Sequence, residues 1–122
     1  MAKTEESVQH SINLVCSSTI IEGNIQTDGD IRFDGKLHGN INAQQRVVIG
    51  EQREIEGDIV CKDCDVSGTI TGNLTIKGIL SLKSTAKVIG NIEIEKLSIE
   101  PGAILSGNCT MKTHFDEEKE NN

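Results

Sequence analysis

A three-residue pattern, glycine followed by Asn or Asp and then an apolar residue, recurs along almost the whole chain. It begins at Gly23, Gly39, Gly57, Gly72, Gly90 and Gly107, at intervals of 16, 18, 15, 18 and 17 residues. A further match at Gly29 falls inside a repeat. Self-similarity at a short, nearly constant period is typical of repeat architectures, in which each unit buries its apolar face only against its neighbours. Most of the 122 residues are therefore expected to form one solenoid.

Within each repeat the apolar residues fall at every second position, and this alternation is interrupted three times. The column two residues after the glycine, for example, reads Ile25, Ile41, Ile59, Leu74, Ile92 and Cys109. Alternation in twos is strand spacing with one buried face, so each repeat predicts three short strands separated by corners. The expected fold is all-β: a single-stranded parallel β-helix of about six coils of roughly 17 residues, stacked about 4.8 Å apart around a triangular aliphatic core.

The corners explain both the glycines and the uneven intervals. Repeats one, two and four carry one extra residue at the second corner, and repeats one and three lack two residues at the third. Glycine suits a corner because some turn conformations exclude a Cβ. Four residues before the pattern glycine, the residue is small in Gly35, Gly68, Ala86 and Ala103. Arg53 breaks that column.

The chain has only two residues of the Phe, Tyr and Trp type, Phe33 and Phe115. This scarcity fits a narrow core filled by aliphatic ladders, in which aromatic rings would be crowded.

The charge and the N-terminal residues restrict partners and location. Twelve Lys and Arg against 19 Asp and Glu give a net charge of -7, which disfavours nucleic acid and anionic membranes. The opening MAKTEESVQH lacks the apolar stretch of a signal peptide, and no run approaches the roughly 18 residues of a membrane helix. We therefore expect a cytosolic protein with reduced thiols at Cys16, Cys61, Cys64 and Cys109.

Two groups of residues suggest chemistry, and each also has a structural interpretation. Cys61 and Cys64 form a C-x-x-C, a spacing used by zinc knuckles and thiol oxidoreductases. Both fall on inward columns, where cysteine packs as a small hydrophobe, and no second pair completes a metal site. The acidic residues of the first repeats, which resemble a calcium loop or a lyase cleft, are Asp28, Asp30 and Asp34. A lyase would also need a basic partner and a sugar groove, and 122 residues leave no long loops to build one, so a solvated corner is favoured.

The remaining enzymatic interpretations are weaker. The histidines, at His10, His38 and His114, are scattered, which argues against a three-histidine zinc site. Gly23, Gly29 and Gly35 have the six-residue spacing of hexapeptide acyltransferases, but the next position in that register is Ile41 rather than a small residue. This break argues against the acyltransferase fold. No P-loop or Rossmann motif leads into a helix, so neither a nucleotide nor another cofactor is expected. The favoured role is structural rather than enzymatic. A small β-helical enzyme, acyltransferase-like or lyase-like, and a thiol or metal-binding module using Cys61 and Cys64 are the alternatives.

The succession of motifs resembles the bactofilins, a family of bacterial polymer-forming cytoskeletal proteins. It runs through IEGNI, FDGKLHGNI, RVVIG, IEGDI, VSGTITGNL, KVIGNI and LSIEPGAILSGN, over about residues 14 to 112. The resemblance implies a right-handed β-helix with short disordered tails, which assembles end to end without nucleotide and scaffolds cell-shape or cell-envelope proteins. The corresponding division is a flexible tail at 1–13, a β-helix domain at 14–112 and an acidic tail at 113–122. Only Ile12, Leu14 and Val15 are available as an N-terminal anchor, which argues against direct membrane attachment.

Physical reasoning also leads to self-association. A solenoid needs polar caps because its end coils expose apolar cross-sections and unpaired strand edges. No cap is evident in the sequence, so like chains are expected to stack end to end. The residues expected at the junctions are Leu14, Val15, Ile21, Cys109, Met111 and Phe115. The acidic residues that follow, Asp116, Glu117, Glu118 and Glu120, favour solubility or a basic partner. The inner face of the cell membrane is the alternative to a free cytosolic location.

Overall fold

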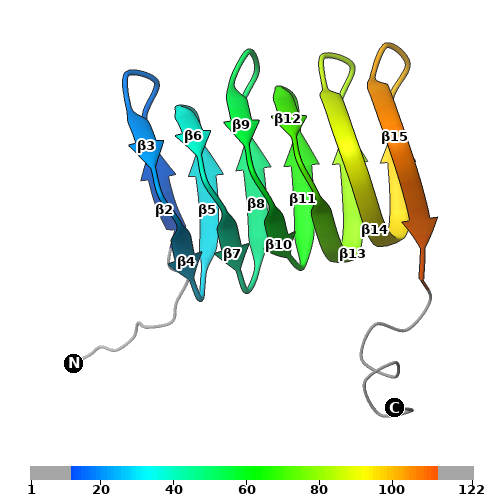
Figure 1. The fold of residues 1–122 in the computed structure, drawn as a ribbon, viewed down its shortest axis with the longest axis horizontal. Helices are drawn as coiled ribbons and strands as arrows, with labels where there is room; N and C mark the ends of the chain where they lie inside the picture. The colour runs from blue at the N-terminus through cyan, green and yellow to red at the C-terminus, as the bar shows by residue number, and fades with distance from the viewer. Residues whose placement is uncertain (1–11, 113–122) are drawn as a thin grey trace.

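The computed structural model describes residues 12–112, and every regular element in that range is a β-strand. The strands form one sheet that winds into six stacked coils of parallel strands. Figure 1 shows these coils side by side, with β2 at one end of the rod and β15 at the other. The predicted parallel β-helix is confirmed, while its right-handed sense stays an expectation from the resemblance.

Each coil contributes one strand to each of three faces. The first face contains β2 (Ile12–Val15), β5 (Asp30–Phe33), β8 (Arg46–Ile49), β11 (Asp63–Val66) and the last parts of β13 (Leu74–Leu82) and β14 (Lys87–Ile99). The second face contains β3 (Ile20–Glu22), β6 (Lys36–His38), β9 (Glu54–Glu56), β12 (Thr69–Thr71) and the first parts of β14 and β15 (Ile104–Met111). The third face contains β4 (Ile25–Thr27), β7 (Ile41–Ala43), β10 (Ile59–Cys61) and segments of β13, β14 and β15.

The strand register confirms the predicted columns. On the third face Ile25 pairs with Ile41, and on the second face Ile21 pairs with Leu37. The corner lengths also follow the predicted scheme, because the turn after β5 is short and the turn after β8 is longer. The first strand, however, begins at Ile12 rather than at residue 14. The expected tail at 113–122 lies outside the described residues.

The core consists of aliphatic ladders, with Phe33 as the one aromatic side chain among residues 12–112. All of the buried residues in this range are apolar, and most inward side chains between Ile31 and Ile94 are almost completely excluded from solvent. Burying each Ile, Leu or Val contributes roughly 1.5–3 kcal/mol relative to an exposed side chain. Stability therefore comes from columns in which every coil covers the one before it.

The corner between the second and third faces explains the recurring Gly-Asn or Gly-Asp pair. Each pattern glycine has a positive φ, and a Cβ on Gly57 would lie 1.6 Å from the carbonyl oxygen of Gly39. The side chain after the glycine bonds to the next coil: Asn40 Oδ1 accepts the backbone N–H of Asp58 at 2.9 Å. Asp58 Oδ1 in turn accepts the N–H of Asn73 at 3.1 Å. The glycine permits close stacking, and its neighbour satisfies a corner donor.

Candidate assembly surfaces at the two ends of the solenoid

The N-terminal surface is the open side of the first coil. The residues that head the core columns there are Asn13, Val15, Ile21, Ile25 and Thr27. Val15, Ile21 and Ile25 are partly buried and pack against the core. Asn13 Nδ2 donates to Thr27 Oγ1 at 2.8 Å and to the carbonyl oxygen of Asp30 at 3.2 Å. This end therefore combines three apolar side chains with a hydrogen-bonded polar pair.

Leu14 does not lie where the junction prediction needs it. It pairs with Arg32 and its side chain is 62% exposed, whereas Asn13 and Val15 pair with the buried Ile31 and Phe33. Successive side chains of a strand point to opposite faces, so Leu14 lies on the outside of the first coil. Asn13 is the column member that the sequence reasoning missed. Counting back one repeat from Ile31 would have found it.

The C-terminal surface is the open side of the last coil and is more apolar. Its column ends are Leu97, Ile99, Leu105, Cys109 and Met111. Ile99 is 48% exposed and Met111 is 58% exposed, although their partners in the preceding coil, Leu82 and Ile94, are buried. Exposed apolar side chains at the end of a continuous core indicate a surface that a further coil would cover. Phe115, the other residue expected at this end, lies outside the described residues.

Both surfaces also present unpaired backbone. Within residues 12–112, β2, β3 and β4 each pair with one strand only, and β15 pairs only with β14. Their free edges carry N–H and C=O groups that a parallel strand from another chain could bond. Gly23 gives a further sign of an open end, because a Cβ there would meet no atom within 4 Å, unlike the later pattern glycines.

The Cys61–Cys64 pair is placed for packing. Both side chains are buried, and Cys61 Sγ donates to the carbonyl oxygen of Asp63 at 3.2 Å. The hydrogen bond with Cys61, together with burial, raises the pKa of the Cys64 thiol well above its ordinary value. Because metals and disulfide exchange both need the thiolate, this environment opposes either role.

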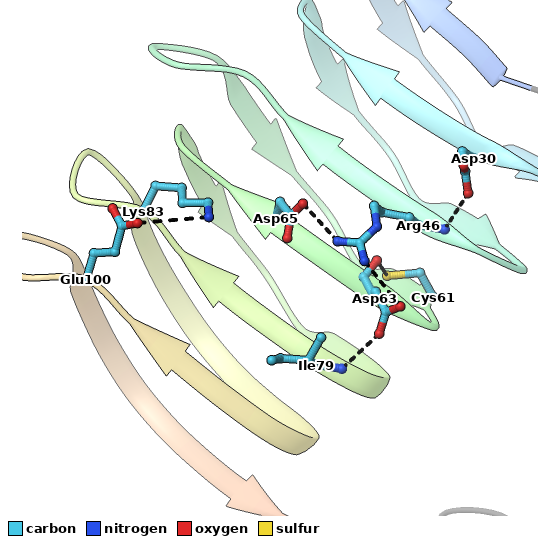
Figure 2. Close-up of polar contacts among 8 residues, drawn as sticks. All are labelled: Asp30, Arg46, Cys61, Asp63, Asp65, Ile79, Lys83 and Glu100. Atoms are coloured by element: carbon cyan, nitrogen blue, oxygen red, sulfur yellow. Dashed lines mark hydrogen bonds and ion pairs between the residues drawn. The ribbon is translucent and has the colours of Figure 1, made fainter.

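The acidic residues of the first repeats act separately. Asp30 Oδ1 accepts the backbone N–H of Arg46 at 3.0 Å, and Asp34 bonds Arg32 at 2.9 Å. Figure 2 shows Arg46 between Asp30 on one side and Asp63 and Asp65 on the other, with Asp65 at 2.8 Å from the guanidinium. Within residues 12–112 no three His, Cys, Asp or Glu side chains gather as a metal site. Asp30, Asp63 and Asp65 link neighbouring coils, whereas the contact of Asp34 with Arg32 lies within one coil.

The fold and its two open ends define a class of protein: a uniform parallel β-solenoid suited to stacking on copies of itself. No helix within residues 12–112 is long and apolar enough to cross a membrane. The two ends present apolar side chains from the core columns and backbone groups from the strand edges. Groups of both kinds can contact a coil of the same shape.

Comparison with known proteins identifies the family. The model of the bactofilins, described as polymer-forming cytoskeletal proteins, matches residues 13–110. The chain belongs to the bactofilin family. It is therefore a polymer-forming cytoskeletal protein and not an enzyme.

Individual relatives agree with this assignment. The chain is 29% identical over 98 residues to bactofilin BacO of Myxococcus xanthus, covering 80% of this chain and 78% of that protein. It is 22% identical to BacP of the same organism, of which it spans 41%. A cryo-EM reconstruction of Thermus thermophilus bactofilin double helical filaments has a similar fold, with a TM-score of 0.74 at 20% identity. That likeness covers 82% of this chain and 99% of the other.

Proposed function

We propose that the chain polymerises through its two terminal coils, without nucleotide. We further propose that the filament scaffolds cell-shape or cell-envelope proteins in the cytosol, with the inner face of the membrane as the alternative location. The observation that best supports end-to-end assembly is the exposure of the apolar side chains at the C-terminal column ends, above all Met111. Covering them requires another coil, and a second copy supplies one with the same triangular section. The family's polymer-forming character supports the scaffold role.

Substitution at Met111 tests the junction. Met111→Arg removes roughly 1.5–3 kcal/mol of apolar burial and adds the cost of desolvating a charge. Together these changes should weaken each C-terminal junction by about 3–5 kcal/mol, or two to three decades in affinity. The variant should remain folded, because the columns from Ile31 to Ile94 are unchanged, but should form short oligomers. Negative-stain microscopy without nucleotide, with sedimentation, measures the change.

The matched control is Thr110→Arg. Thr110 is the neighbour of Met111 on β15, it is exposed, and it pairs with the exposed Glu93 outside the core. This variant should form filaments of normal length. If Met111→Arg also forms them, the C-terminal surface is not the junction. The same assay would test the other predicted junction residues, which are Val15, Ile21, Cys109 and Phe115.

A further inference from the structure

The outer surfaces of the three faces differ in charge. On the first face the outward strand residues that carry a charge are Asp30, Arg32, Arg46, Asp63, Asp65 and Lys96. On the second face they are Glu22, Lys36, Glu54, Glu56 and Lys87. On the third face, within residues 12–112, Glu93 is the one charged strand residue. The strands of its first four coils are therefore uncharged, in a chain with a net charge of -7.

One outward column runs along the whole third face. It reads Gln26, Asn42, Val60, Thr75, Glu93 and Thr110, and each member pairs with the next without a change of register. Figure 1 shows the strands of its first half, β4, β7 and β10, side by side along the rod. Beside this column the corner residues are Asn24, Asn40, Asp58, Asn73, Asn91 and Asn108. We call these two columns together the third-face strip.

The two carboxylates of the strip already have partners in the chain. Asp58 Oδ1 accepts the backbone N–H of Asn73 at 3.1 Å. Glu93 Oε1 lies 3.3 Å from Lys112 Nζ, so the charges of these two side chains offset one another. The strip therefore presents mainly amide and hydroxyl groups, with the half-buried Val60 among them. It is the long side of the rod that least repels a chain of like charge.

The chemistry of the strip suits a second copy of the chain. Bringing two charged faces together requires that their charges lose water or meet opposite charges in register. Two copies of the strip avoid this requirement, because the side-chain amides of asparagine and glutamine both donate and accept hydrogen bonds. Both copies also repeat these groups about every 4.8 Å. The rows of one strip can therefore meet the rows of the other at a constant spacing.

The size of the strip indicates that side-by-side contact depends on polymerisation. Coils about 4.8 Å apart and strands about three residues wide give on the order of 300 Å² for the strip of one rod. A stable interface buries about 800 Å² on each partner. Two single rods should therefore not pair. A filament repeats the strip in every subunit, and about three subunits in a row supply the required area.

We propose that the third-face strip is the surface through which two filaments of this chain lie side by side. The inference rests on the end-to-end filament proposed above, which repeats the strip, but it concerns a different surface from the junction. Each rod has one such strip, and its other two faces are charged. Pairs of filaments should therefore form at lower salt than thicker bundles do.

Pairing is measured by negative-stain microscopy of the full chain over a salt series from about 0.1 M to about 1 M. This series shortens the screening length from about 10 Å to about 3 Å. Val60→Glu places a charge in the strip and should reduce the fraction of filament length found in pairs at least tenfold. The reduction should persist at high salt, because a carboxylate in the contact must still lose its water. Equal pairing of Val60→Glu and the unchanged protein would overturn the proposal.

Val48→Glu is the matched control for the added charge. Val48 is half-buried like Val60 but lies on the outside of the first face, where it pairs with Arg32 and Asp65. The two variants have the same net charge and differ in the face that carries the new carboxylate. Pairing of Val48→Glu should stay within twofold of the unchanged protein. An equal loss in both variants would show that net charge, rather than the strip, controls pairing.

A second variant keeps the test independent of any folding defect at Val60. Asn42 is exposed on β7, and Asn42→Asp adds a charge without changing the size of the side chain. It should raise the salt concentration at which half of the filament length is paired at least twofold. An unchanged midpoint would contradict the proposal.

Filament length separates this proposal from that of the junction. Val60→Glu and Asn42→Asp should form single filaments of normal length, since neither residue lies at an end of the rod. Met111→Arg should form short oligomers that do not pair at any salt in the series, because they present too little of the strip. Filaments of normal length from Met111→Arg would contradict the junction alone. Pairs formed by its short oligomers would contradict the area argument for the strip.

Discussion

The pattern glycines are fixed by distance as well as by backbone conformation. A Cβ on Gly39, Gly72 or Gly90 would lie 1.8 Å from the carbonyl oxygen of the pattern glycine one coil earlier. Atoms cannot approach so closely, so a methyl group at this corner must separate two coils. Because the coils share continuous core columns, a local separation also reduces packing in the core.

Gly57 provides the sharpest test, since its Cβ would lie 1.6 Å from Gly39 oxygen. Gly57→Ala should lower the free energy of unfolding by roughly 3 kcal/mol or more, through steric displacement added to backbone strain. Gly23→Ala is the matched control. Gly23 also has a positive φ, at 136°, but has no neighbouring atom within 4 Å of the added carbon. Gly23→Ala should therefore lower the free energy of unfolding by only about 1–2 kcal/mol. Urea denaturation measures both, and equal losses would show that stacking contributes nothing.

Because of Cys64, the free energy of unfolding is expected to depend on pH in the alkaline range. The hydrogen bond with Cys61 and burial raise its pKa in the folded protein well above the reference value of 9.0. The unfolded chain therefore loses this proton first as pH rises. The contribution of the neutral thiol is complete below about pH 9 and is lost as pH rises from there toward the folded pKa. Between pH 8 and 10 the unfolding free energy should fall by about 1 kcal/mol more in the unchanged protein than in Cys64→Ala.

Strand positions were predictable because burial follows a period of two and the repeat aligns each column with the next. The registers of Ile41, Ile55 and Leu80 follow directly from that alignment. The outward position of Leu14 was missed because the inward position of the first strand holds a polar residue, Asn13, which pairs with the buried Ile31. The sequence also indicated that Arg53 is an exception in a column of small residues.

Side-chain hydrogen bonds at the corners are expected to stabilise the fold, and substitution of Asn40 tests this. Its Oδ1 accepts the N–H of Asp58, so Asn40→Ala leaves a corner donor without this partner and should lower the unfolding free energy by about 1 kcal/mol. Asn42→Ala, which removes an exposed side chain from β7 in the same coil, should change it by less than about 0.5 kcal/mol. Thermal unfolding of both variants gives the comparison. An equal effect at the two positions would refute a specific role for the corner ladder.

The net charge of -7 controls how assembled rods approach each other. Repulsion between like charges opposes side-by-side contact, and added salt screens it over a distance of about 10 Å at 0.1 M. Raising salt should therefore thicken filaments into bundles or sheets, as seen by negative stain, while the apolar junctions persist. Bundles that disperse as salt rises would instead indicate that ion pairs hold neighbouring rods together.

Parallel strands wound around one axis also give the rod a direction of mechanical strength. The backbone hydrogen bonds between coils occur on all three faces, and they lie close to the axis along which the coils stack. Tension along the rod is shared by these bonds, and the chain itself crosses every boundary between coils. No covalent bond crosses a junction between two subunits of a filament built end to end. Such a filament under load therefore parts between subunits and releases intact rods that can join again.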